Sequence, residues 1–164
     1  MKQEDLQKQF DLLIKIRDRI TDAHDAVNQI RDIKKQVNDL AARAKAMPGG
    51  KVVTDAAKEL VKKLSAVEEE ILQVKSKSRQ DPLNFPIKLN NKLASLARVV
   101  ASADARPTKQ SYDVFNELSA QLDQQLTALD KIIKEEVPKF NDLVRQQNVP
   151  AVILKPKKKK TTSD

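Results

Sequence analysis

Apolar side chains recur at steps of three or four along the first 47 residues. This stripe runs from Leu6 to Met47 with a mean step of about 3.4 residues, which keeps it on one face of a helix. A Pro-Gly-Gly sequence follows at 48–50, and such residues end helices. The pattern therefore predicts a first helix over residues 2–46.

Three further segments show the same period and predict helices over residues 54–79, 86–104 and 108–147. Thr54 is the expected N-cap of the first of these, because its hydroxyl can accept a bond from a free backbone N–H. Pro138 lies inside the last segment, where its ring would clash with the carbonyl of residue 134. We therefore expect a kink in the fourth helix.

Short connections between helices make successive helices antiparallel. The sequence thus predicts an all-α fold: an antiparallel up-down-up-down four-helix bundle with two long helices, the first and fourth, and two shorter ones. Because the lengths differ, four helices should lie side by side only near Met47 and Thr108. At the other pole the start of the first helix, with Leu6, Phe10 and Leu13, should meet the end of the fourth.

The chain divides into three parts by composition. Residues 1–148 are the predicted bundle, residues 149–154 an apolar extended segment, and residues 155–164 a basic disordered tail. The tail carries five lysines and one aspartate, and so holds half of the formal net charge of +8. Aromatic residues make up 3% of the chain, so the bundle lacks the stacking platforms typical of nucleic-acid grooves.

The tail has two interpretations, which the sequence leaves open. It could bind nucleic acid or an acidic surface, or it could be a solubilising end. The candidate polyanion-binding residues are Lys157, Lys158, Lys159 and Lys160.

The 164 residues include no cysteine, one histidine and two adjacent glycines. These counts exclude disulfides, Cys-based zinc sites and Gly-rich phosphate loops. His24 stands between two aspartates and is expected in solvent, as are Glu68–Glu70 and Glu135–Glu136, because consecutive helical positions point about 100° apart. We predict no catalytic residue, no cofactor and no metal, and therefore no enzyme. No apolar run approaches the roughly 20 residues that span a bilayer.

Two segments are less typical of a helical bundle and are candidate partner contacts. Within residues 81–93, Phe85 and two asparagines could form a recognition loop, or Phe85 could plug the bundle end while the asparagines bond backbone groups. Residues 149–154 are apolar without a helical period, which favours docking onto another domain. The candidate contact residues are Phe85, Asn90, Asn91, Val149, Val152, Ile153 and Leu154.

Several of these stretches resemble a known family. Residues 7–12, 81–93, 100–108, 140–143 and 148–150 resemble the helical C-terminal region of bacterial sortilin-like glycosyl hydrolases with Asp-box repeats. The resemblance implies a larger protein with an N-terminal β-propeller and, with a signal peptide on that part, an extracytoplasmic location. None of the propeller repeats lies in this chain, which also shows no signal peptide, so the compartment stays open.

Taken together, the sequence favours a non-catalytic helical accessory module that packs against or oligomerises a larger, propeller-type protein. The expected partner is protein, either upstream domains or a second copy, with no small-molecule substrate. The alternative is a small helical protein that binds nucleic acid or another polyanion through its lysine tail.

Overall fold

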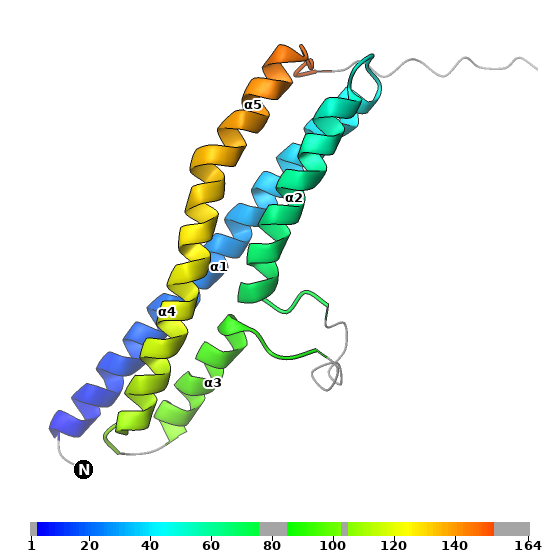
Figure 1. Ribbon diagram of the computed structural model, residues 1–164. Helices are drawn as coiled ribbons and strands as arrows, with labels where there is room; N and C mark the ends of the chain where they lie inside the picture. Colours follow the sequence, from blue (N-terminus) through cyan, green and yellow to red (C-terminus); the bar gives the residue numbers. More distant parts are fainter. Residues whose placement is uncertain (1–2, 76–84, 103–104, 153–164) are drawn as a thin grey trace, which may run out of the picture.

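The computed structural model describes residues 3–75, 85–102 and 105–152, and over these residues the protein is helical without any β-strand (Figure 1). This confirms the all-α prediction. The elements are α1 (Gln3–Lys45), α2 (Lys51–Ile71), α3 (Leu89–Ser102), α4 (Lys109–Lys131), the π-helical turn η2 (Ile132–Glu136) and α5 (Val137–Gln146).

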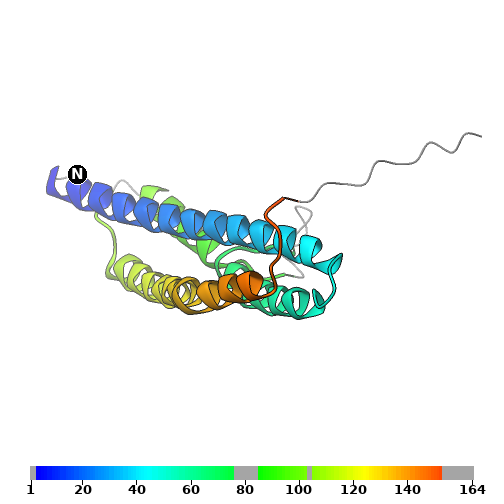
Figure 2. The ribbon, with the colours of Figure 1, turned by 90° about the horizontal axis from the view of Figure 1, so that it is seen from above.

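The helices form three rods that lie side by side: α1, the continuous α4–η2–α5 rod, and α2 followed by α3. α1 and the continuous α4–η2–α5 rod run in the same direction. Two contacts show this: Arg19 of α1 bonds Asp123 of α4, and Arg43, farther along α1, bonds the carbonyl of Ala151 beyond α5. α2 and α3 run against α1 and follow each other end to end as the third rod (Figures 1 and 2).

The predicted up-down-up-down order is therefore wrong. α3 continues in the direction of α2, and the start of α1 meets the end of α3, where the Gln9 side-chain amide donates to the Val100 carbonyl at 2.7 Å. α5 ends at the opposite pole. The cause is the connection between α2 and α3: α2 ends at Ile71 rather than near residue 79, and a long connection does not force a reversal of the chain.

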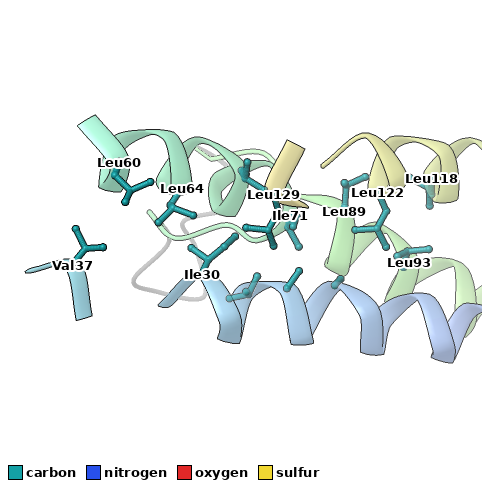
Figure 3. Close-up of a cluster of buried hydrophobic side chains, with 14 of the residues drawn as sticks. Ile30, Val37, Leu60, Leu64, Ile71, Leu89, Leu93, Leu118, Leu122 and Leu129 are labelled. Carbon is teal, nitrogen blue, oxygen red and sulfur yellow. The ribbon is translucent and has the colours of Figure 1, made fainter. Parts of the chain in front are cut away.

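One core extends along the whole bundle. Figure 3 shows Ile30 of α1 facing Leu64 and Ile71 of α2, with Leu89 of α3 and Leu122 of α4 farther along the same layer. All five side chains are buried. Burial of each contributes about 1.5–3 kcal/mol, so the core is the main source of stability.

The helix starts differ in how they are capped. α2 begins at Lys51, so Thr54 lies in its first turn and is not the N-cap; its hydroxyl donates to the Lys51 carbonyl at 2.8 Å. Gly50 takes the N-cap position without a side-chain bond. The predicted start of the last rod near Thr108 is confirmed, since its Oγ1 accepts from the Ser111 N–H at 3.2 Å.

The sequence predicts a kink near Pro138, and the structure has a π-turn before this residue. Proline lacks an N–H and its ring clashes with the carbonyl four residues earlier in an α-helix. The wider turn Ile132–Glu136 ends two residues before Pro138, and the Val137 N–H donates to the carbonyl of Ile132, five residues back. The rod thereby continues past a residue that an α-helix does not accommodate.

The turn between α1 and α2 depends on Gly50. A Cβ built there would lie 1.7 Å from the Ala44 carbonyl oxygen, whereas a Cβ at Gly49 would meet only the Gln147 side chain, at 3.5 Å. Gly49 has a φ of +77°, which costs an L-residue about 1–2 kcal/mol.

We predict that Gly50→Ala destabilises the protein more than Gly49→Ala, because backbone at Ala44 must move in the first case and only backbone strain arises in the second. The expected loss is at least about 2–3 kcal/mol for Gly50→Ala and about 1 kcal/mol for Gly49→Ala. Urea unfolding of both variants measures the order. An equal or larger loss for Gly49→Ala would contradict the tight turn described here.

Candidate interaction surfaces

The structure separates the two predicted contact segments. Asn90 and Asn91 lie in the first turn of α3, and Phe85 lies in the connection that leads to it from α2. Figure 1 shows that α3 starts near the middle of the molecule. Val149 and Val152 lie at the pole that holds the α1–α2 turn, so the two segments do not form one surface.

The segment after α5 crosses that pole from α5 toward α1 (Figure 2). The chain turns at Asn148, whose φ is +51°, and the Val149 N–H donates to the Val144 carbonyl at 3.2 Å. Arg43 Nη1 then donates to the Ala151 carbonyl at 2.5 Å. These bonds fix where the chain leaves the bundle.

The side chains of this segment differ in exposure. Val149 is half-buried and packs on the core, whereas Val152 is 79% exposed. Ile153, Leu154 and the lysines Lys157, Lys158, Lys159 and Lys160 lie outside the described residues. Docking of residues 149–154 onto another domain stays a prediction. Val149 already packs on the core of the bundle.

At the α2–α3 junction the predicted residues are only partly available. Phe85 and Asn90 are half-buried and Asn91 is exposed. The Gln73 side-chain amide donates to the Pro86 carbonyl at 2.7 Å, which joins the two ends of the connection between α2 and α3. Within the described part of the chain, Asn90 Oδ1 is buried without a hydrogen-bond partner, so here the asparagine does not satisfy a backbone group as one interpretation expected.

An apolar groove that the sequence analysis missed lies between α3 and α4. It has a volume of about 440 Å³, and its lining includes Ile87, Leu96, Val99, Val114 and Leu118. We call it the α3–α4 groove. Val99 is 61% exposed. The sequence held a signal: Val99 and Val100 are adjacent on a helix and point about 100° apart, so only one can face the core.

The start of α1 is also more exposed than predicted. Phe10 is 58% exposed and Leu6 is 45% exposed, while Leu13 packs partly on the core. The prediction that these three residues meet the end of the fourth helix is wrong, because α5 ends at the other pole.

A second groove, here called the acidic groove, follows the contact between α1 and α4. Its volume is about 670 Å³. Ala26, Leu126, Leu129 and Ile133 supply apolar lining, and the polar lining residues are Asp22, Asp25, Gln29 and Asp130. No lysine or arginine lines it among the described residues. His24, beside the groove in sequence, is exposed as expected.

Glu68 is the one buried carboxylate among the described residues, which corrects the prediction of a solvent-facing position. It is 4% exposed and accepts from Arg31 Nε at 2.7 Å and from Lys34 Nζ at 2.9 Å, both on α1. The reason is the width of the buried stripe: Glu68 follows Leu64 by four residues and Val67 by one, at the flank of the face that α1 covers. Glu69 is half-buried and Glu70 is exposed.

Burial alone would raise the pKa of Glu68, but the hydrogen bonds from Lys34 and Arg31 outweigh it and hold the pKa below its ordinary value. The Lys8 bond lowers the pKa of Glu4, and the bonds from Lys63 and Lys139 lower that of Glu136. All three carboxylates are thus stabilised as anions by lysine or arginine, which suits ion pairing between and along helices.

The described residues contain no group of three or more His, Asp or Glu side chains arranged to hold a metal ion. Among the described helices, none combines the length and the apolar character that crossing a membrane requires. Comparison with models of known families, with curated proteins and with solved structures finds no match to this chain.

We predict that Glu68→Gln lowers the free energy of unfolding by about 1–3 kcal/mol near pH 7, because two charge-assisted hydrogen bonds become weaker. A lowered native pKa gives stability that is present above the unfolded pKa of about 4.3 and is lost as the pH falls through the native pKa. The difference between wild type and variant should therefore shrink between pH 6 and pH 3.

The matched control is Glu70→Gln, since Glu70 is exposed and its pair with Lys88 at 3.3 Å is at the surface. Denaturant unfolding at several pH values measures both variants. A pH-independent difference for Glu68→Gln, or an equal loss in the control, would show that the buried ion pair does not act as described.

Proposed function

We propose that the chain is a non-catalytic helical interaction module that binds an apolar segment of a larger protein in the α3–α4 groove. The observation that carries this proposal is the exposure of Val99 at the groove, where a large apolar side chain has no packing partner that hides it from solvent. Ile87, 41% exposed, lines the same groove, and exposed apolar side chains that gather in one place mark contact sites in soluble proteins.

The shape of the groove supports a helix or a short extended segment as the bound element. Two neighbouring helices, α3 and α4, form its walls, and Ile87 extends the apolar surface beyond the start of α3. A partner that places one or two apolar side chains there would use the common helix-in-groove mode, in which apolar anchors give affinity.

The resemblance to sortilin-like proteins suggests a larger, propeller-type protein as the partner. In that case the module would pack against the propeller or join two copies, and it would act outside the cytoplasm.

The second candidate function is polyanion binding through the lysine tail. The specific observation in its favour is the density of charge: five of the ten residues 155–164 are lysine. A cluster of this kind attracts phosphate or sulfate groups by releasing counterions, and its affinity falls steeply with salt.

For the first function we predict that Val99→Asp weakens binding at the α3–α4 groove at least tenfold, because a charge would have to be buried with the ligand. Amphipathic peptides are selected from a display library on the wild-type full chain, and their affinities are then measured for each variant by fluorescence anisotropy.

Val52→Asp is the matched control, since Val52 is 52% exposed on α2 and lies outside the groove. Peptides that bind Val99→Asp as tightly as wild type, or that lose binding only to Val52→Asp, would place the binding surface elsewhere and overturn the proposal.

For the second function we predict that deletion of residues 155–164 abolishes retention on a heparin column at moderate salt, whereas Val99→Asp elutes with the wild type. The salt concentration at elution is the measurement. Unchanged retention after the deletion would exclude the tail as the polyanion-binding element.

A further inference from the structure

We propose that residues 153–160 of this chain dock in the acidic groove, running back along the face of α1 that carries Arg43. This inference does not depend on the proposed function. It assigns an occupant to a groove between α1 and α4 and an intramolecular partner to the apolar and basic segment that follows Val152.

The exit point of the chain lies on the correct face of α1. Arg43 bonds the Ala151 carbonyl, and Arg43 follows Asp25 by 18 residues. Eighteen residues are five helical turns, so the two side chains leave α1 on the same side, separated by about 27 Å along the axis.

The length of the segment matches this separation. Lys159 follows Ala151 by eight residues, and an extended chain covers about 3.3 Å per residue, or about 26 Å in total. Lys159 can therefore reach the level of Asp25, and Lys160 approaches Asp22, about 5 Å farther along α1.

Along this path the surface is first apolar and then acidic, and the segment is first apolar and then basic. Between Arg43 and the groove, Leu40 and Ile33 of α1 are only partly buried. Ile153 and Leu154 come first after Val152 and would lie near this apolar part, and the lysines come next, where the aspartates are.

The aspartates of the groove have room for further cations. Within the described part of the chain, Asp25 has no ion pair. Asp22 accepts from Arg19 at 3.1 Å and Asp130 from Lys134 at 2.6 Å, but a carboxylate offers about four lone-pair positions. The three aspartates are exposed, so their pairs with lysines would be weakened by salt.

The test uses paramagnetic broadening in the full chain. The protein contains no cysteine, so Thr161→Cys carries a nitroxide label at a single position and leaves every lysine in place. At low salt we expect loss of amide signal intensity for residues 18–29 and 126–133 but not for α2. The broadening should fall at least threefold in 1 M salt, where the screening length is about 3 Å.

The triple variant D22N/D25N/D130N should lose the broadening to the same extent. Its control is D55N/E59Q/D113N, which changes the charge equally at exposed positions outside the groove and should keep it. If the groove variant does not fold, replacement of Lys157, Lys158, Lys159 and Lys160 by glutamine tests the contact from the tail side and leaves the bundle intact.

Three results would overturn the proposal: broadening confined to residues near Arg43, broadening unchanged in the groove variant or in the tail variant, and broadening that requires a second molecule. The last is recognised by mixing isotope-labelled chain without nitroxide and spin-labelled chain without isotope. Signal loss in that mixture would make a second copy the occupant instead of the chain's own segment.

Discussion

The apolar stripe of α1 is the constraint on which the fold depends. α1 is 43 residues long, about 65 Å, and its stripe continues over that whole length. α2, at 21 residues, covers only about half of it. The 14 residues of α3 cover most of the remainder because they follow α2 in the same direction. The first turns of α1, with Leu6 and Phe10, stay exposed.

The same constraint explains why the long rods are continuous and the third is not. α1 and the α4–η2–α5 rod each contact both α2 and α3, and so hold the two short helices in line. A break in either long rod would divide the core. The π-turn before Pro138 preserves this continuity, and Lys63 of α2 bonds Glu136 within that turn at 2.6 Å. The third rod tolerates a break because α2 and α3 each pack against the two long rods.

Hydrophobic periodicity predicted the existence and the buried faces of the helices, but it does not encode their direction. The apolar seams that contain Leu64 in α2 and Leu93 in α3 are the same for either orientation of α3. The predicted direction of α3 rested on a short connection between α2 and α3, and α2 ends too early, at Ile71, for the connection to be short. The prediction for Glu68 is wrong because a charged residue is expected to face solvent. Lysine and arginine on α1 pair with this carboxylate and offset the cost of burying its charge. The groove beside Val99 could not be predicted from the sequence, because residues of both α3 and α4 form it.

The proposed docking of the tail in the acidic groove would compete with polyanion binding, because both use the same lysines. The bundle presents aspartates along the α1–α4 groove, while half of the net charge is in the tail that leaves the bundle beside Arg43. Under the proposed docking, lysines paired with Asp25 and its neighbours would not be free for an external polyanion, which would first have to displace them. Because both interactions weaken with salt, ionic strength alone does not decide between them. The proposed contact of Ile153 and Leu154 with α1 would not be screened by salt, and it would favour the intramolecular state.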